Sequence, residues 1–341
     1  MITTSEWVSL GHPDKIADYI SCYILDRYLE QDPLTRYALE VQIKDHFVTL
    51  GGEITSKAEF SESEIAMFVR AAVNEIGYTY QYMNFWGREN AICGPEMQVA
   101  QHISQQSPDI AQGVNAGGFG DQGIFFGMAT NTPDTGYMPK DWWLARKIGK
   151  HLYDSRYAGL DIKTQVTMND NRIDEIVVAI PMNHRHFESD IWNAVSYCCN
   201  GNREYKIYVN GTGKYVKHGP KGDCGTTGRK LAVDFYGGNC RIGGGSPWTK
   251  DGTKADLCLN LLAREKALSY VKENPEFPAV YSAISCRIGS PEIIVSITDR
   301  HGNDLMTYRE RISPDELIEK FRLREPRFAD MCRNGLFHVD E

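Results

Sequence analysis

The residues best suited to chemistry lie in one basic, glycine-rich stretch between residues 214 and 254. Glycine lets backbone N–H groups approach an anion closely, and lysine and arginine add charge and directed donors. Three aspartates oppose eight cations in this stretch, which are Lys214, Lys217, Lys221, Arg229, Lys230, Arg241, Lys250 and Lys254. Because the whole chain carries a formal net charge of −8, this concentration predicts a small polyanionic ligand and argues against nucleic acid.

Two motifs divide the stretch. The run from His218 to Lys230 is rich in glycine, but it matches neither a Walker A loop nor a dinucleotide-binding fingerprint. Three successive glycines at 243–245 precede Lys250, Lys254 and Asp256 and suit a loop that lies against a ligand. Each motif is equally compatible with an exposed hairpin loop whose glycines serve only turns, so the residues alone leave both interpretations open.

A third motif, Gly11-His12-Pro13-Asp14-Lys15, opens a predicted helix. Helix N-termini favour anions, and Asp14 is well placed to hold a Mg²⁺ ion that a polyphosphate would bring. An acid in a first helical turn more often only complements the helix dipole, so Asp14 alone does not decide. Two further glycine motifs, Gly51-Gly52-Glu53 and the segment 118–123 with its buried-looking Asp121, are interpreted as loops.

The elements that must hold these motifs follow from hydrophobic periodicity. Helical spacing of apolar residues predicts a helix over 13–29, and strict alternation predicts a strand over 37–43. Ser61 and Glu64 form a capping box before a helix that Gly77 ends. The remaining patterns predict hairpins over 164–180 and 280–298, a strand over 231–236, and helices over 142–153, over 257–271 and from Ser313-Pro314 onward. Hairpins mixed with helices favour an α+β fold over a doubly wound sheet.

Length and composition limit the classes of protein that remain. A chain of 341 residues has room for two or three domains. The first residues lack a signal-peptide pattern and no apolar run is long enough to span a bilayer, so we expect a cytoplasmic protein with no membrane or nucleic-acid partner. The nine cysteines are scattered without a Cys-x-x-Cys pair, which predicts reduced thiols, and no zinc site is expected at His184 and His186.

Seven motifs together resemble the S-adenosylmethionine synthetase family, in which they occur in the same order. They run from residue 5 to residue 256 and read SEWVSLGHPDKIAD, GGEIT, QSPDIAQGV, GFGDQG, LDIKTQVT, GPKGDCGTTGRKLAVDFYGG and GGGSPWTKDGTKAD. The resemblance implies a methionine adenosyltransferase, which makes S-adenosylmethionine from ATP and L-methionine and then hydrolyses the triphosphate to pyrophosphate and phosphate.

The resemblance also implies an architecture. Three similar α+β domains, at about 1–104, 113–216 and 217–341, are expected in a pseudo-threefold arrangement, and strands can be exchanged between them. Their sheets would pack across a dimer interface. The active sites would then lie between the subunits of a homodimer or of a dimer of dimers.

The resemblance assigns roles residue by residue. ATP contacts are implied for His12, Asp121, Asp161, Ile162, Lys163, Lys214, Tyr215, Asp223, Arg229, Lys230, Ser246 and Lys250. The implied catalytic residues among them are His12, Lys163, Arg229, Lys230 and Lys250. Methionine contacts are implied for Glu53, Gln106, Asp121, Asp223 and Lys254. The implied cofactors are Mg²⁺, held by Asp14 and Asp256, and K⁺, held by Glu40.

The chemistry of such a reaction agrees with the composition of the motifs. A methionine sulfur has no proton to lose when it attacks carbon, so the reaction needs alignment and stabilisation of the leaving triphosphate but no general base. Departures from the family pattern occur at Leu10, Phe119, Ile242 and Pro247-Trp248. The segment between Val114 and Gly118, in the loop expected to gate the site, is also short.

Two other classes of protein stay open at this stage. A kinase or ligase on a different fold would explain the basic glycine loops, although not seven motifs in order. A nucleotide-binding relative without turnover would explain the short gating segment and the departure at Phe119.

Overall fold

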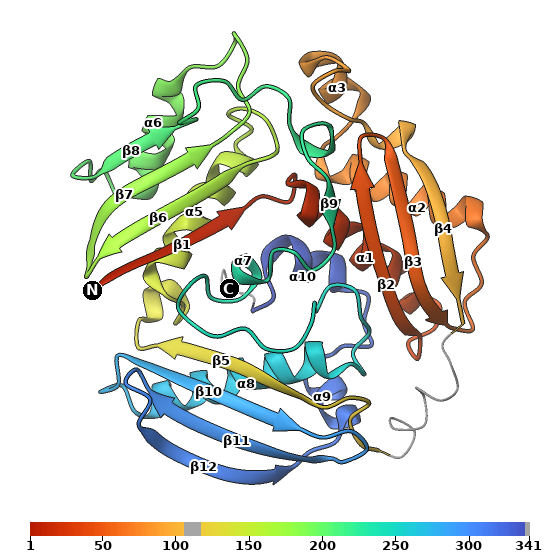
Figure 1. Ribbon diagram of the computed structural model, residues 1–341, viewed down its shortest axis with the longest axis vertical. Helices are drawn as coiled ribbons and strands as arrows, with labels where there is room; N and C mark the ends of the chain where they lie inside the picture. The colour runs from red at the N-terminus through yellow and green to blue at the C-terminus, as the bar shows by residue number, and fades with distance from the viewer. Residues whose placement is uncertain (106–116, 338–341) are drawn as a thin grey trace.

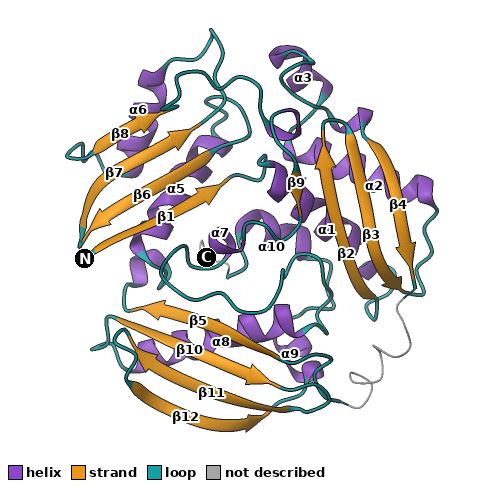
Figure 2. Cartoon of the chain, in the orientation of Figure 1, coloured by secondary structure: helices purple, strands orange, loops and turns teal. Residues whose placement is uncertain are grey.

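The computed structural model describes residues 1–105 and 117–337. This part of the chain contains three four-stranded sheets with helices packed on them, so the predicted α+β class is confirmed. Figure 1 shows the three sheets arranged around a central group of helices, and Figure 2 shows helices lying along one side of each sheet. The predicted methionine contact Gln106 and most of the short segment before Gly118 lie outside the described residues.

Sheet I consists, in spatial order, of β4 (Gln98–Ser104), β3 (Phe47–Thr55), β2 (Arg36–Lys44) and β9 (Gly225–Thr226). β2 and β3 form an antiparallel hairpin, whereas β4 runs parallel to β3. Buried residues alternate with outward-facing ones along β2, as the sequence pattern predicts. The buried face packs on α1 (Pro13–Leu29), which in turn packs on α2 (Glu62–Ile76).

Sheet II consists of β1 (Ile2–Val8), β6 (Lys163–Asn169), β7 (Arg172–Ala179) and β8 (Lys206–Val209). The predicted hairpin of β6 and β7 is confirmed. Asp170 at its turn has a positive φ of 53°, a conformation that Asp tolerates better than most residues. The helix α5 (Lys140–Asp154) packs on β1 and β6, and α6 (Glu188–Cys198) packs on α5.

Sheet III consists of β12 (Asp304–Arg311), β11 (Glu292–Asp299), β10 (Ala279–Cys286) and β5 (Gly123–Thr130). Its strands pair antiparallel throughout, and α8 (Ala255–Glu273) packs across β5 and β10. The remaining helices are α3 (Tyr80–Trp86), α7 (Leu231–Asp234), α9 (Pro314–Lys320) and α10 (Phe328–Asn334), with 3₁₀ turns at Gly94–Glu96, Pro133–Thr135 and Gly219–Lys221.

Each sheet takes one edge strand from a distant part of the chain. β1 pairs with β6 in sheet II, β5 pairs with β10 in sheet III, and β9 pairs with β2 in sheet I. The last of these pairings draws the basic stretch across the centre of the molecule, where α1 is buried along nearly its whole length. An isolated bridge between Ala38 and Lys250 holds the far end of the same stretch beside β2.

The predicted helix signals are confirmed where capping chemistry defined them. The Ser61–Glu64 capping box begins α2, and Gly77 ends it with a left-handed φ of 119°. Ser313 and Glu316 form a second capping box at α9, with Pro314 in the first turn. In each case the side chain satisfies a backbone N–H group that the helix leaves unpaired.

Three predictions about local structure are wrong. Residues 231–236 do not form a strand, because α7 lies at the centre of the molecule and burial there does not alternate. Gly51-Gly52-Glu53 is part of β3 and not a loop; a Cβ atom on Gly52 would lie 2.0 Å from the carbonyl oxygen of Ala38, so the glycine permits close strand pairing. Asp121 is exposed, since its loop lies on the surface before β5.

All nine cysteines are free thiols, and seven of them are buried. In the described ranges, no helix combines the length and apolar character needed to cross a membrane.

Candidate active site

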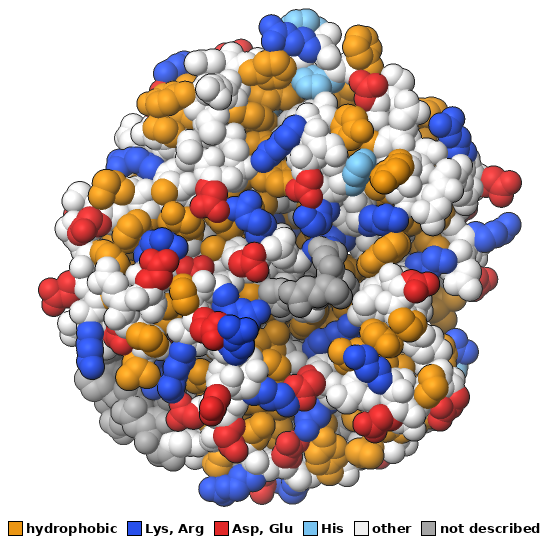
Figure 3. Space-filling view, turned by 180° about the vertical axis from the view of Figure 1, so that it is seen from behind, with side chains coloured by type: hydrophobic (Ala, Val, Ile, Leu, Met, Phe, Trp, Pro, Cys, Tyr) orange, Lys and Arg blue, Asp and Glu red, His pale blue; other side chains and the backbone are white. Residues whose placement is uncertain are grey.

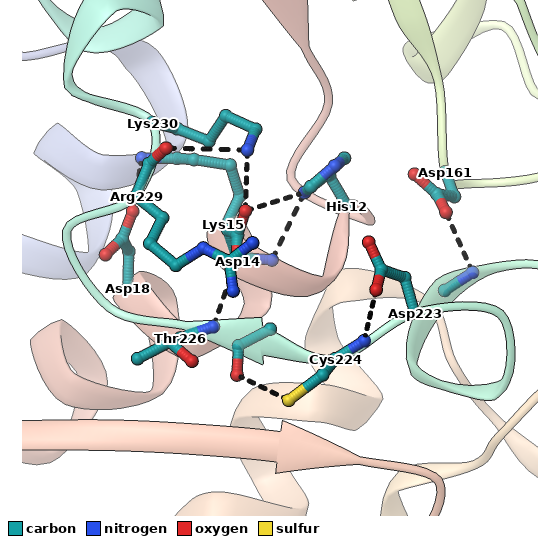
Figure 4. A network of polar contacts seen from close by, with 12 residues as sticks. His12, Asp14, Lys15, Asp18, Asp161, Asp223, Cys224, Thr226, Arg229 and Lys230 are labelled. Atoms are coloured by element: carbon teal, nitrogen blue, oxygen red, sulfur yellow. Dashed lines mark hydrogen bonds and ion pairs between the residues drawn. The ribbon is translucent and has the colours of Figure 1, made fainter.

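The basic loop at residues 225–230 lies directly against the N-terminus of α1 (Figure 4). Gly225 permits this approach, because a Cβ atom there would lie 2.1 Å from the carbonyl oxygen of Pro13. The backbone N–H of Thr226 then donates to Asp14 Oδ1 at 2.9 Å. The helix that the first motif predicts and the loop that the basic stretch predicts therefore form one site.

Two cations contact Asp14 where the loop meets the N-terminus of α1. Lys230 Nζ donates to Asp14 Oδ2 at 2.6 Å, and Arg229 Nε lies 3.5 Å from Asp14 Oδ1. The aspartate is 1% exposed, whereas the Arg229 side chain is 54% exposed. Arg229 thus remains available to an anion that arrives beside the positive end of the helix dipole, and the Lys230 side chain, 20% exposed, lies beside it.

His12 caps the same helix and stays neutral. Its Nδ1 accepts from the backbone N–H of Asp14 at 3.2 Å, so the single ring proton resides on Nε2. Burial, assisted by the charges of Lys163 and Lys230, lowers the pKa of His12 to about 2. The residue can therefore donate a hydrogen bond from Nε2 without adding a charge.

A buried network of ion pairs also contacts the loop at residues 225–230. Asp18, one helical turn after Asp14, accepts from the backbone N–H of Gly228 at 2.9 Å. Lys15 Nζ donates to Asp18 at 3.0 Å and to Asp234 at 2.7 Å. Burial lowers the pKa of Lys15, but the two carboxylates outweigh it and keep the amine protonated.

Trp248, one of the departures from the family pattern, belongs to this network. Its indole Nε1 donates to Asp234 at 2.8 Å, and its ring lies 4.7 Å from Lys15 Nζ. The side chain is 1% exposed. The substitution therefore anchors the second glycine motif to the buried network.

A pocket of about 440 Å³ opens beside this junction. The predicted residues that line it are His12, Asp161, Lys163, Lys214, Tyr215 and Asp223. The side chain of Ile162 is instead buried in the core, because its backbone N–H and carbonyl bind Ser9. The pocket thus combines cations, several neutral donors and two carboxylates.

Asp161 has one carboxylate oxygen with a hydrogen-bond partner and one without. Its Oδ2 accepts from the backbone N–H of Gly219 at 2.8 Å, but its buried Oδ1 has no hydrogen-bond partner within the chain. Burial raises the pKa of Asp161. Because an unpaired buried acceptor is costly, this oxygen fits a hydroxyl or N–H group of a bound molecule.

The second glycine motif forms the other side of the basic region. Gly245 N donates to Asp256 Oδ1 at 2.7 Å, and Lys250 forms an ion pair with the same carboxylate. The two basic loops meet where Gly228 faces Ser246. Lys254, the N-cap residue of α8, is half-buried and lies two residues before Asp256.

Three predicted residues lie elsewhere in the chain. Glu40 and Glu53 project from the outward face of sheet I, where Glu40 accepts a hydrogen bond from the Thr227 hydroxyl. Asp121 lies in the exposed loop before β5 in sheet III. Within one chain, none of the three lines the pocket next to His12.

Sequence reasoning gave no role to five residues around the site, which are Lys15, Asp18, Asp234 and Trp248 in the buried network and His218 in the pocket wall. A signal existed for Lys15 and Asp18, because charged residues three apart near a helix start lie on one face. No local signal linked them to Asp234, which is 219 residues away from Lys15.

The surface charge is mixed. On the face that Figure 3 shows, basic and acidic side chains of the described residues alternate, with apolar side chains between them.

Comparisons with known proteins give a consistent result. Models of the N-terminal, central and C-terminal domains of S-adenosylmethionine synthetase match residues 1–108, 116–215 and 217–341. S-adenosylmethionine synthases from Brachyspira hyodysenteriae and Mesoplasma florum are each 34% identical, covering 98% and 99% of this chain and 92% and 95% of their own length. The solved structure of an unusual S-adenosylmethionine synthetase from Campylobacter jejuni is 29% identical, with a TM-score of 0.86 over 99% of this chain and 94% of that chain.

Proposed function

The chain belongs to the S-adenosylmethionine synthetase family, and from this premise we propose how its central site makes S-adenosylmethionine. ATP occupies the pocket beside His12, with its nucleoside near Asp161 and Tyr215. Its triphosphate extends toward the two basic loops. The convergence of the α1 N-terminus with Arg229 and Lys230 is the observation that carries this assignment.

The reaction is a displacement at the 5′ carbon of ATP. The methionine sulfur donates an electron pair to form the new C–S bond, and the C–O bond to the triphosphate breaks with its electrons moving to the leaving oxygen. His12 and the cations Lys163, Arg229, Lys230 and Lys250 stabilise that oxygen and its phosphates. Two opposite unit charges about 4 Å apart attract by roughly 4 kcal/mol at an effective dielectric constant of 20, before desolvation costs.

The two substrates need to be aligned before the displacement. Asp161 Oδ1, which lacks a partner in the chain, accepts from the nucleoside, while Lys214, Tyr215 and Asp223 close the pocket around it. Ser246 contacts the phosphates beside Gly228. Fixing both reactants in this way removes much of the entropic barrier. The same cations then hold the triphosphate for hydrolysis to pyrophosphate and phosphate.

The metal ions of the family fit the donors present. Asp14 and Asp256 offer carboxylate oxygens at the two basic loops, and Mg²⁺ in such sites is commonly held by one or two carboxylates plus phosphate oxygens. In residues 1–105 and 117–337, no group of three or more acidic, histidine or cysteine side chains is placed to hold a metal ion. Bound Mg²⁺ would neutralise part of the triphosphate charge, and Glu40 is the proposed ligand of K⁺.

Methionine recognition is proposed to involve a second subunit. Glu53, Asp121 and Lys254 do not line the pocket of their own chain, and Glu53 faces outward from sheet I. Large apolar side chains on outward strand positions, including Phe47, Ile124 and Tyr208, are 46% to 60% exposed. Packing of sheets between two copies would bury them.

Such packing of sheets would form a homodimer or a dimer of dimers whose active sites lie between subunits. This proposal also includes three domains, at 1–104, 113–216 and 217–341. It includes a methionine contact by Gln106, which lies outside the described residues. A cytoplasmic location is proposed with them, on the basis of family membership.

One incubation tests the function. The purified protein is mixed with ATP, methionine, Mg²⁺ and K⁺, and S-adenosylmethionine, phosphate and pyrophosphate are measured. Release of all three that depends on methionine is expected. Formation of ADP or AMP would instead support a kinase or ligase, and ATP binding without any product would support a relative that lacks turnover.

A further inference from the structure

We propose that His218, together with Tyr82, is a positioning residue for the nucleoside end of ATP. This inference rests on the proposed function, because it concerns how the wall of the ATP pocket is held. His218 joins two segments that are distant in sequence: the segment directly before β6, which carries Asp161, and the loop that carries Lys214 and Tyr215.

His218 connects these segments through a series of hydrogen bonds in which each donor and each acceptor can be assigned. His218 Nδ1 lies 2.7 Å from the carbonyl oxygen of Val216, which can only accept, so Nδ1 carries the proton. His218 Nε2 must then accept, and Tyr82 Oη donates to it at 2.6 Å. Tyr82 Oη in turn accepts from the backbone N–H of Leu160 at 2.9 Å. Each donor and acceptor in the chain is used once, which leaves a single consistent arrangement.

Burial keeps this arrangement in place. His218 is 0% exposed and lies among aromatic rings, with the ring of Trp86 4.8 Å away, edge-on at 74°. Burial lowers the pKa of His218 to about 4, so the ring holds one proton at neutral pH. The hydroxyl of the neighbouring Tyr78 donates to the carbonyl oxygen of Gly11, directly before His12.

The hydrogen-bond chain fixes Asp161 from both sides. Leu160, which binds Tyr82, precedes Asp161, and Gly219, which follows His218, donates its backbone N–H to Asp161 Oδ2 at 2.8 Å. Tyr215 Oη donates to the Asp161 carbonyl oxygen at 3.1 Å. One carboxylate oxygen is therefore held, and the other, buried and without a partner in the chain, is left as an acceptor for the nucleoside that the proposal places beside it.

His218 itself does not take part in the chemistry. Both ring nitrogens are occupied by Val216 and Tyr82, so no polar atom of the ring is left for ATP. Loss of these hydrogen bonds should thus weaken ATP binding through Asp161 and Tyr215. Methionine binding and the rate of the displacement should stay unchanged.

The test uses Tyr82→Phe, His218→Asn and the double variant in the full-length enzyme. Tyr82→Phe removes one hydroxyl and keeps the ring, so folding should be retained. His218→Asn keeps a donor near the position of Nδ1 but loses the acceptor for Tyr82. Tyr80→Phe, an exposed tyrosine on the same helix α3, is the matched control.

Each single variant is expected to raise the KM for ATP about tenfold, the size expected from the loss of one buried hydrogen bond, with kcat and the KM for methionine unchanged. The double variant should be no worse than His218→Asn alone, because both changes break the same contact. Equilibrium binding of ATP without methionine should weaken by the same factor.

Unchanged ATP binding in Tyr82→Phe, equal changes for both substrates, or additive effects in the double variant would overturn the positioning role. A wild-type enzyme that binds ATP but forms no S-adenosylmethionine would count against the proposed function alone, because the binding measurement still decides the role of His218.

Discussion

Asp14 and Asp18 lie one turn apart on α1 and accept alternate backbone N–H groups of the same loop, from Thr226 and Gly228, both at 2.9 Å. The two carboxylates nevertheless face different surroundings. Asp14 pairs with Lys230 and Arg229 at the pocket side, whereas Asp18 pairs with the buried Lys15. Equivalent loop contacts are thus combined with a proposed chemical role for Asp14 and a structural role for Asp18.

Replacement of Asp14 should affect catalysis more than folding. Asp14→Asn keeps an acceptor for Thr226 but removes the charge that gathers Lys230 and Arg229 and that is proposed to hold Mg²⁺. We expect kcat to fall about 100-fold, the size seen when one transition-state contact is lost, and the Mg²⁺ concentration for half-maximal activity to rise. Steady-state kinetics at several Mg²⁺ concentrations measures both. Wild-type turnover would contradict the assignment.

Replacement of Asp18 should affect stability first. Asp18→Ala leaves Lys15 buried with one carboxylate fewer, and breaking a buried ion pair typically costs about 3–5 kcal/mol. Thermal unfolding followed by circular dichroism should therefore give a clearly lower Tm than for Asp14→Asn. Equal melting temperatures for the two variants would mean that the buried network does not stabilise the loop.

Removal of single cations should reduce turnover without unfolding the protein. Lys163 and Lys250 belong to the pocket and to the second glycine motif, respectively. Lys163→Ala and Lys250→Ala are each expected to lower kcat at least tenfold because the leaving triphosphate loses a counter-charge. Lys206→Ala, an exposed lysine on β8, is the control. Rates equal to that of the control would reject both residue assignments.

The buried His12 should make stability depend on pH. Its folded pKa of about 2 lies below the unfolded value near 6.5, so the unfolded chain takes up the proton first as the pH falls. The stability that neutral His12 contributes is present above pH 6.5 and is lost progressively below it.

Between pH 7 and pH 5, the wild type should lose about 2 kcal/mol of unfolding free energy relative to His12→Asn. Urea unfolding of both proteins at one protein concentration measures this difference. The comparison with the variant cancels the opposite contribution of Asp18 and Asp26, whose pKa values burial raises to about 6. Parallel pH curves for the two proteins would show that His12 titrates normally.

Much of the fold followed from local patterns. The limits of α1, the capping box of α2 and the start of α9 at Ser313-Pro314 depend on residues within one or two turns of each other, so periodicity and cap residues were sufficient to predict them. The strand predicted at 231–236 failed because alternation indicates a strand only when one face is exposed, and the segment of α7 is covered on several sides.

The candidate site was predictable as a set of residues but not as an arrangement. Motif order identified Asp14, Lys230 and Lys250, yet Asp14 and Lys230 are separated by 216 residues and meet only because β9 joins sheet I. The supporting residues Asp234, Trp248 and His218 carried no local signal, since each contacts a residue far away in the sequence: Lys15 in the first two cases and Tyr82 in the third.

By itself, the sequence determined the types of the strongly periodic elements, the α+β class and the family motifs with their chemistry. Only the tertiary structure decided that Asp18 forms a buried ion pair with Lys15 and that one oxygen of Asp161 has no partner in the chain. It also decided that His218 connects distant segments of the pocket wall through hydrogen bonds. The physical reason is that hydrogen bonding, burial and pKa depend on neighbours in space, whereas local sequence patterns record only neighbours along the chain.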